Sequence, residues 1–525
     1  MPNDRKPRIK FSITARSDEV TGNSHSCAFI FQDGERFDFF VDAGMFMEEK
    51  YNFLNSTQDF DFSKSNTIFI THNHADHMGG MPIVVKKGFN GKFYTTRETK
   101  ELLPISLYDA AKIEHTYSAY PLFTEEDVTE SLKMVYGYRY LEPIYITDNI
   151  TATFLENGHM RGSALILIQA KKEDEELNVI FTGDYNDKNY FFTPKDLPSW
   201  VKNLNNLIIV QESTYGDSYS SDCTECFDNE VISAIDEKKS ILIPCIAQER
   251  YEVVLDHLAK LEELGKLNNV QVICDGQLAS AYLAKYRRAY KDFCLPKNIL
   301  FVDDELTRKL VISSPRQKII VTTSGMASNG PARVYIPELI SRSNWKVIFT
   351  CYQSEGTLGK SLMDFVQDYD ERKEKVEKKL CHADKEDSEL LKNSLLFDAF
   401  GNKVKVAAEV VQTSEFSSHA KCDVLLKFLK NFKSVLAVCI NHGETSVKES
   451  YKSKVEDLPF ITNVEVLTRG KNVVIDKYNL YSSEVRELTK KEAPSSTKQI
   501  ASKLKNFDGK AACIRPVPRM HCYHY

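Results

Sequence analysis

Short apolar runs, each ending in a polar or metal-ligating residue, recur through residues 1–213 of the chain. The runs lie at 37–44, 67–74, 151–159, 178–184 and 207–213. Continuous apolar strands of this kind are typical of sheets that are buried on both faces. Functional side chains collect where such strands end in loops, so the pattern predicts a sheet core with a row of site residues along one edge.

From about residue 214 the chain alternates strands and helices. A segment at 248–264 has apolar positions at helical spacing, and a mixed-charge run at 366–392 predicts a solvated helix. The expected strands are 241–247, 270–276, 318–325 and 346–352. This alternation favours a second, α/β region built on a parallel sheet.

After residue 403 the first pattern returns, which predicts a domain whose chain leaves to build a second domain and then comes back. The tail is basic, with nine Lys or Arg against four Asp or Glu, a net of +5. The predicted divisions are a first domain at 1–210, an inserted domain at 211–402, a returning part at 403–481 and a tail at 482–525.

Composition adds cellular context. A hydrophobic fraction of 42% and a charged fraction of 27% are ordinary for a globular protein, and no apolar run approaches the ~20 residues of a membrane span. The polar, basic start predicts no signal peptide, and 12 scattered cysteines predict reduced thiols in a cytoplasmic protein. The formal charge, 68 − 74 = −6, does not by itself indicate a nucleic-acid binder.

The segment 71–80, THNHADHMGG, carries the strongest chemical signal. Four potential metal ligands, His72, His74, Asp76 and His77, follow an apolar strand within six residues. Residues two apart on an extended segment point the same way, so His72 and His74 can bind one ion while the other pair faces a neighbouring ion. Imidazole and carboxylate ligands suit zinc, with manganese or iron as alternatives. A His-rich helix cap is the competing interpretation, but only 12 of 525 residues are histidine.

HxHxDH after an apolar strand resembles the metallo-β-lactamase superfamily. The resemblance implies an αββα sandwich with one or two metal ions. Three further residues match the family's motifs in order: Asp42 the early aspartate, His159 the third-motif histidine, and Asp184 the aspartate that bridges two metals.

Later motifs resemble the β-CASP branch of that superfamily, which processes nucleic acids. The matches are QESTYG at 211–216 with Glu212, SSHA at 417–420 with His419, and NHGE at 441–444 with His442. The segments 19–27, 324–330 and 351–360 resemble the cleavage-and-polyadenylation-factor endonuclease subgroup. His25, in the first of these segments, is expected to lie in a loop and only to structure it. In this branch a histidine at the last motif implies RNA as the substrate. The expected fold is therefore an α/β metallo-β-lactamase αββα sandwich with an inserted α/β β-CASP domain.

The chain also departs from the branch. The usual glycine-arginine after the first β-CASP strand is Glu249–Arg250 here, and the usual Asp-Ser-Pro-Leu-Ala begins Asp275–Gly. These departures lie in the inserted domain and not among the matched metal ligands, so they are expected to affect substrate positioning more than the chemistry.

The resemblance implies two Zn²⁺ ions per chain and a role for each site residue. Asp42 is expected to orient a ligand histidine, and His419 to act as a general acid held by Glu212. Asp184 would give one oxygen to each ion. The first ion is assigned His72, His74, His159 and Asp184, and the second Asp76, His77, His442 and Asp184.

The expected activity is hydrolysis of RNA in a groove between the two domains, and a narrow groove favours single-stranded RNA. The alternatives are an RNase J-like 5′ exonuclease, a DNA nuclease, a small-molecule hydrolase and a catalytically inactive subunit of an RNA-processing complex. No membrane partner is expected, and a homodimer is one candidate assembly. Cys223 and Cys226 have CxxC spacing without a second pair, so two ordinary thiols are expected there.

Overall fold

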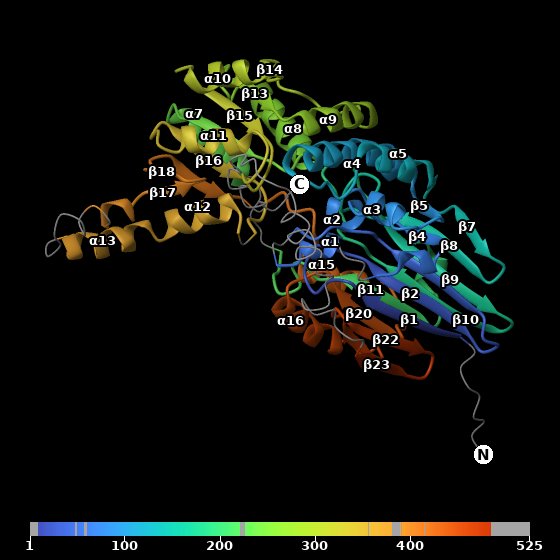
Figure 1. Cartoon of the computed structure of the whole chain (residues 1–525). Coiled ribbons are helices and arrows are strands. Elements are labelled where there is room, and N and C mark those ends of the chain that lie inside the picture. The colour runs from blue at the N-terminus through green and yellow to red at the C-terminus, as the bar shows by residue number, and fades with distance from the viewer. Residues whose placement is uncertain are drawn as a thin grey trace, which may run out of the picture.

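The computed structural model describes residues 9–47, 50–56, 60–220, 226–354, 356–380, 389, 391–413 and 415–484. Two large sheets stack face to face in one half of the molecule, and a third sheet with its own helices forms the other half (Figure 1). Part of the predicted tail therefore lies outside the described residues, as do Cys223 and most of the segment 381–390.

The first stacked sheet has eight strands and the second has seven. The order in the first sheet is β23 (Leu480–Glu484), β22 (Lys471–Asp476), β1 (Ile9–Ala15), β2 (His25–Phe31), β3 (Arg36–Val41), β4 (Thr67–Phe69), β5 (Lys92–Thr96) and β6 (Val135–Tyr138). The order in the second is β21 (Val464–Val466), β20 (Ala437–Asn441), β11 (Leu207–Glu212), β10 (Glu175–Phe181), β9 (Ala164–Lys172), β8 (Ile150–Glu156) and β7 (Pro143–Thr147).

Aromatic side chains join the two sheets. Phe11 and Phe39 of the first sheet meet Phe181 of the second, with ring centroids 6.3 and 6.5 Å apart in edge-on geometry. All three are almost fully buried, and burying one such side chain contributes about 1.5–3 kcal/mol. The apolar runs of the sequence thus form the inner layer of a sandwich.

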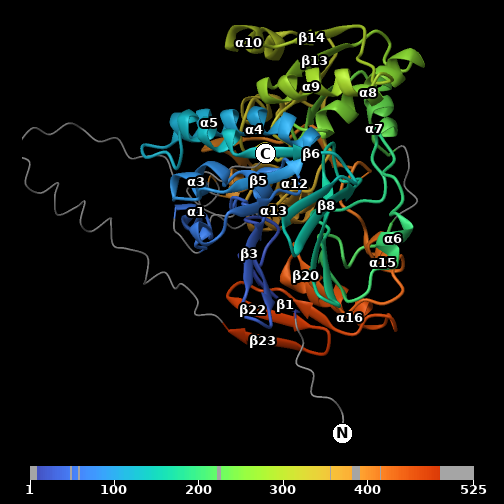
Figure 2. The same cartoon turned by 90° about the vertical axis from the view of Figure 1, so that its right-hand side faces the viewer.

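Helices cover the outer faces of the sandwich (Figure 2). Leu103 and Leu107 of α4 pack on the first sheet, and Leu425 and Phe428 of α15 pack on the second. The first sheet carries α2 (Ala75–Met78), α3 (Met81–Lys86), α4 (Arg97–Tyr117) and α5 (Glu125–Lys133), and the second α6 (Ser199–Lys202), α15 (Cys422–Leu429) and α16 (Thr445–Glu456). Two short helices, α1 (Phe53–Ser56) and η1 (Phe62–Lys64), precede β4. The predicted αββα layering is confirmed.

The third sheet is parallel throughout. Its order is β14 (Ile299–Phe301), β13 (Gln271–Asp275), β15 (Lys318–Thr322), β12 (Ser240–Pro244), β16 (Trp345–Phe349) and β19 (Glu409–Gln412). Helices α7 (Cys226–Asp236), α8 (Arg250–Glu263) and α9 (Gln277–Ala289) cover one face, and α10 (Glu305–Ser313), α11 (Ala332–Leu339) and α12 (Leu358–Gln367) the other. Since β19 pairs with β16, the first part of the segment 403–481 belongs to this sheet and not to the sandwich.

Within the charged run 366–392, residues Tyr369–Leu380 form α13, with ion pairs one turn apart such as Glu371–Lys375. A hairpin of β17 (Phe397–Ala399) and β18 (Asn402–Val404) follows. None of the described helices combines the length and the apolar character that a membrane crossing requires.

The cysteines differ in part from the sequence prediction. Cys226 is disulfide-bonded, so the prediction of reduced thiols throughout is wrong at this residue. Its CxxC neighbour Cys223 lies outside the described residues. Free thiols are found at Cys27, Cys245, Cys274, Cys294, Cys351, Cys422 and Cys439.

Strand directions bring the candidate residues to one edge of the sandwich. The strand pairs β3–β4, β10–β11 and β11–β20 are all parallel, so their carboxyl ends lie together. Asp42, the HNHADH segment, Asp184 and His442 each follow one of these strands, and Glu212 is the last residue of β11. The helices α4 and α9 meet above this edge and join the sandwich to the third sheet (Figure 1).

Candidate metal centre

Four side chains converge on a first potential ligand site. His74 Nδ1 lies 3.1 Å from both His72 Nε2 and His159 Nε2. Asp184 Oδ2 lies 3.5 Å from His72 Nε2 and 3.6 Å from His159 Nε2. The four residues come from three segments of the chain, and the four ligand atoms face one point.

A second group of four adjoins the first. His77 Nε2 lies 3.1 Å from Asp184 Oδ1, 3.4 Å from His442 Nε2 and 3.6 Å from Asp76 Oδ2. His442 Nε2 is in turn 3.5 Å from the Asp76 carboxylate and 3.4 Å from Asp184 Oδ1. Asp184 therefore contributes one oxygen to each group.

The spacing of these atoms fits a tetrahedral metal site. Four donors about 2.0–2.1 Å from one ion lie about 3.3–3.4 Å from each other, and the distances given above fall between 3.1 and 3.6 Å. Asp184 Oδ1 is buried without a hydrogen-bond partner, which is costly for a carboxylate unless a cation compensates it. Both observations indicate that each of the two groups could hold a metal ion.

Hydrogen bonds from the outer ring nitrogens orient the ligand histidines. His77 Nδ1 lies 2.7 Å from Asp42 Oδ2, and His159 Nδ1 lies 3.1 Å from the Ser418 carbonyl oxygen. An acceptor at Nδ1 holds the proton there and leaves the Nε2 lone pair free for a metal. His72 Nδ1 and His442 Nδ1 contact the hydroxyls of Thr71 and Thr214 at 3.0 and 2.9 Å.

Burial also shapes the protonation of the ligands. It lowers the pKa of His74 to about 4, and it lowers the pKa of His72 and His159 well below the usual value, so these imidazoles are neutral and able to bind metal. At His77 burial acts in the same direction, but the charges of Asp184, Asp76 and Asp42 outweigh it and raise the pKa.

The backbone is strained where the ligands sit. Asp42 and His442 both adopt positive φ, at 64° and 51°, which is uncommon for residues other than glycine and often marks functional sites. Gly183, just before Asp184, has φ 53°, and a Cβ placed there would lie 2.8 Å from Thr71 Cβ. Glycine is therefore required at this position for the strand end to reach the HNHADH segment.

His419 lies beside both groups without belonging to either four-residue set given above. Its Nδ1 is 3.0 Å from Glu212 Oε2, and its Nε2 is 3.8 Å from Asp184 Oδ2. Glu212 Oε1 also accepts the backbone N–H of Tyr185, directly after Asp184. Burial would lower the pKa of His419, but the charges of Glu212 and Asp184 outweigh it and raise the pKa to about 9.

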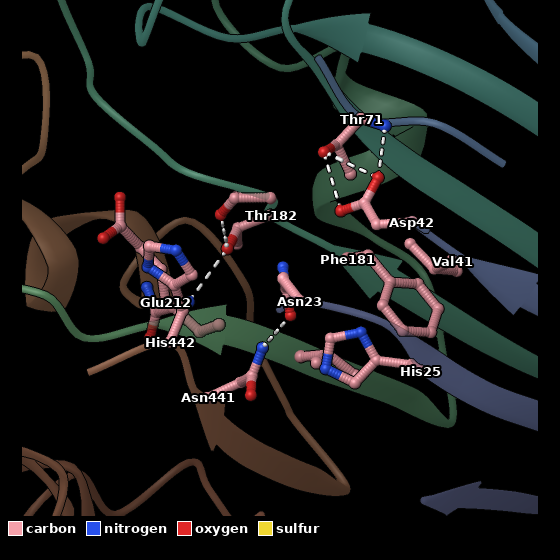
Figure 3. A pocket seen from close by; sticks show the side chains of 13 residues that line it. Asn23, His25, Val41, Asp42, Thr71, Phe181, Thr182, Glu212, Asn441 and His442 are labelled. Carbon is pink, nitrogen blue, oxygen red and sulfur yellow. Dashed lines mark hydrogen bonds between the residues drawn. The ribbon is translucent and has the colours of Figure 1, made fainter. Parts of the chain in front are cut away.

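A small cavity of about 10 Å³ lies behind the second group (Figure 3). Asn23 Oδ1 accepts a hydrogen bond from Asn441 Nδ2 at 3.0 Å there, and His25 faces the same space. His25 was expected in a loop, but it begins β2 and is buried with both ring nitrogens unpartnered. The volume is close to that needed for one water molecule.

The structure thus brings together all the site residues expected from the sequence. Sequence reasoning missed the residues that support them: Asn23, Thr71, Thr214, Ser418 and Asn441. Thr71, Thr214 and Asn441 lie next to or within the motifs, which was a usable signal. Nothing in the sequence pattern singles out Ser418 as a carbonyl acceptor.

Family models match three segments of the chain. They are the metallo-β-lactamase superfamily domain over residues 32–195, the Beta-Casp domain over 252–362 and the Zn-dependent metallo-hydrolase RNA specificity domain over 403–467. The first includes the HNHADH segment, His159 and Asp184, and the last includes His419 and His442.

Three curated proteins illustrate the similarity. The RNase J-like protein of Methanocaldococcus jannaschii is 27% identical over 393 residues, 72% of this chain and 82% of its own. Ribonuclease TTHA0252 of Thermus thermophilus is 25% identical over 445 residues, which cover 81% of this chain and 91% of that ribonuclease. The transcription termination factor FttA of Thermococcus kodakarensis is 29% identical over 323 residues. These residues cover 57% of this chain and 48% of the factor, so the match spans about half of the factor.

Proposed function

The chain belongs to the β-CASP branch of the metallo-β-lactamase superfamily, and from this premise we propose that it is a two-zinc ribonuclease. Its reaction would be hydrolysis of RNA phosphodiester bonds in the cleft between the sandwich and the inserted domain. The observation that carries the proposal is the shared carboxylate of Asp184, which joins two four-ligand groups at metal-site spacing.

The ligand assignment follows from this geometry. His72, His74 and His159 would hold the first ion with Asp184 Oδ2, and Asp76, His77 and His442 would hold the second with Asp184 Oδ1. Two bound ions would supply an activated water and a positive field for the scissile phosphate. Asp42 would keep the His77 proton on Nδ1 so that Nε2 can coordinate.

His419 would act as the general acid. Glu212 holds Nδ1, so Nε2 carries the ring's second proton toward the metal ligands. In the proposed reaction the oxygen of water bonds to phosphorus, the bond from phosphorus to the 3′ oxygen breaks, and His419 Nε2 protonates that oxygen. The products would carry a 5′-phosphate and a 3′-hydroxyl.

RNA as the substrate is supported by the RNA specificity model and by the names of the ribonuclease relatives. A single strand suits the site best, because most of the proposed ligands are buried, only His74 and Asp76 are partly exposed, and a lone strand reaches such a recessed site more easily than a duplex. A DNA nuclease and an inactive subunit are the alternatives that an activity assay separates.

The test uses 5′-labelled RNA and the matching DNA strand, with and without a chelator. We expect cleavage of RNA alone, loss of cleavage with chelator and recovery on adding zinc. His115→Ala, at an exposed position of α4, is a control that should keep full activity. Absence of cleavage after zinc reconstitution would favour the inactive-subunit alternative, and equal cleavage of both strands would favour the DNA nuclease.

A 5′ exonuclease is the second candidate, because one relative is named RNase J-like. The same gel distinguishes the two modes. An exonuclease acting from the 5′ end releases labelled mononucleotide first, whereas internal cleavage gives labelled fragments of intermediate length. A homodimer stays a prediction, which sedimentation of the purified chain would test.

A further inference from the structure

The segment between β12 and α8 places two consecutive side chains against two different ligand loops. Gln248 and Glu249 are both buried, and both come from the inserted domain. Their contacts lead to the loop of His159 and to the loop of His72 and His74. These contacts are separate from the ligand groups described above.

Glu249 contacts the loop around His159. Its Oε2 accepts the backbone N–H of Arg161 at 2.9 Å and the hydroxyl of Tyr286 at 2.6 Å. Its Oε1 accepts from the side-chain amide of Asn189. Asn189 also donates to the carbonyl of Gly158 at 3.2 Å, directly before the ligand histidine. One carboxylate from the inserted domain therefore fixes both sides of that histidine loop.

Gln248 contacts the other loop through Asn73, which lies between the ligands His72 and His74. Asn73 Nδ2 lies 2.8 Å from Gln248 Oε1. The same nitrogen lies 2.7 Å from Ser106 Oγ of α4 and 3.1 Å from the Tyr282 hydroxyl of α9. Asn73 thus connects the metal-binding loop to both sides of the domain junction.

The backbone at Glu249 indicates that its side chain matters. Glu249 has φ 67° and ψ −47°, and the N–H of Arg250 bonds to the carbonyl of Gln248 at 2.8 Å. This is the γ-turn with positive φ, which is rare and strained. Glycine adopts positive φ freely, and it is the residue usual here in β-CASP chains. A glutamate can stay in this strained conformation because the hydrogen bonds of its carboxylate hold it in place.

We propose that Gln248 and Glu249 are positioning residues that set the first ligand group from the inserted domain. Glu249 positions the His159 loop, and Gln248 positions the loop of His72 and His74. A shift of the inserted domain would therefore displace both loops together. The inference rests on the ligand roles given under the proposed function, but not on RNA as the substrate.

Hydrogen exchange of the metal-free, full-length chain tests the Glu249 contact and the Gln248 contact separately. Glu249→Gly removes the carboxylate and relieves the strained backbone, so we expect amides 157–163, above all Arg161, to exchange about 10- to 100-fold faster. In this variant residues 71–77 should change little. Gln248→Ala should give the reverse pattern, with faster exchange at 71–77 and little change at 157–163.

Zinc competition on the same variants gives a second readout. Each variant should bind one of its two ions about 10- to 100-fold more weakly, as expected when support of a ligand is lost. Asp275→Asn is the matched control, because Asp275 also accepts a tyrosine hydroxyl, from Tyr335 at 2.8 Å, within the inserted domain. Its carboxylate is held by Tyr335 and Arg308, which both belong to the inserted domain, so the variant should alter neither exchange pattern.

The proposal requires that each variant speeds exchange in its own loop and leaves the other loop unchanged. Unchanged exchange in both loops, or equal acceleration of both loops by both variants, would overturn the inference. If Glu249→Gly fails to fold, Glu249→Gln keeps the side-chain volume while placing an amide donor against Arg161 N–H or Tyr286. The same loop should then exchange faster by a smaller factor, and its unchanged exchange would equally count against the proposal. Because no RNA is present, an absence of nuclease activity would not affect these outcomes.

Discussion

Asp42→Asn should weaken the binding of one metal ion without removing any ligand. Asp42 Oδ2 accepts from His77 Nδ1 at 2.7 Å, and both residues are fully buried. The other oxygen accepts the backbone N–H of Thr71 at 2.8 Å. Asparagine can keep the bond to Thr71, but it then presents an amide donor to His77. The N–H at His77 Nδ1 would then face the N–H of the asparagine amide. Otherwise the histidine proton must move to Nε2, the nitrogen that should bind the metal.

The size of the effect can be estimated in two ways. Loss of a residue that supports a metal ligand typically costs 10- to 100-fold in affinity, or about 1.4–2.7 kcal/mol. Loss of a hydrogen bond to a buried charged group costs about 1.5–3 kcal/mol. The two ranges overlap near 2 kcal/mol, so we expect an affinity loss of roughly 30-fold for the ion held by His77.

The assay is competition for zinc against a chromophoric chelator, with both binding steps resolved. Asp38→Asn is the matched control, because Asp38 lies on the strand β3 that leads into Asp42 but pairs with the exposed Arg36. Only the Asp42 variant should bind zinc more weakly than wild type, and the loss of affinity should fall mainly on one of the two ions. Equal affinity in wild type and the Asp42 variant, or equal weakening in the control, would refute the proposed role of the Asp42–His77 contact.

Further predictions concern the shared carboxylate and the acid. Asp184→Asn should lower the bound zinc at both positions, whereas His159→Ala should lower it at one, as counted by elemental analysis after dialysis. His419→Ala should reduce turnover at least 100-fold, a typical minimum for loss of a general acid, while the zinc content stays at the wild-type level. In metal-free protein, His419 should titrate near pH 9 by NMR, against a usual 6.5, and Glu212→Gln should lower that pKa. A pKa raised on folding stabilises the protein below pH 6.5, and this contribution is lost as the pH rises through 9, which urea unfolding at several pH values can measure.

Much of the site was predictable because its information is local. Six consecutive residues carry four of the proposed ligands, and the strand before them shows as an apolar run. The carboxyl ends of the parallel strands bring these positions to one edge of the sheets, whatever the length and shape of the loops between the strands. The family models support the fold that the motifs imply, and the residue roles stay predictions that the variants above test.

The supporting contacts could not be read from the sequence. Asn73 meets Gln248 across 175 positions of the chain, and His159 meets the Ser418 carbonyl across 259. Such contacts depend on how the inserted domain sits on the sandwich, which no local pattern encodes. His25 was misplaced for a related reason, since a polar residue at the start of a strand looks like part of the loop before it.

The insertion point explains why Glu212 and His419 meet. The strands β11 and β20 are parallel neighbours, and their register pairs Glu212 with Asn441. The chain leaves the sandwich at the end of β11, builds the third sheet and returns through His419 before β20. Glu212 and His419 therefore flank the two crossings, and their 3.0 Å contact lies at the base of the inserted domain. The two crossings of the chain thus place the proposed acid and the carboxylate that holds it at the junction of the sandwich and the inserted domain.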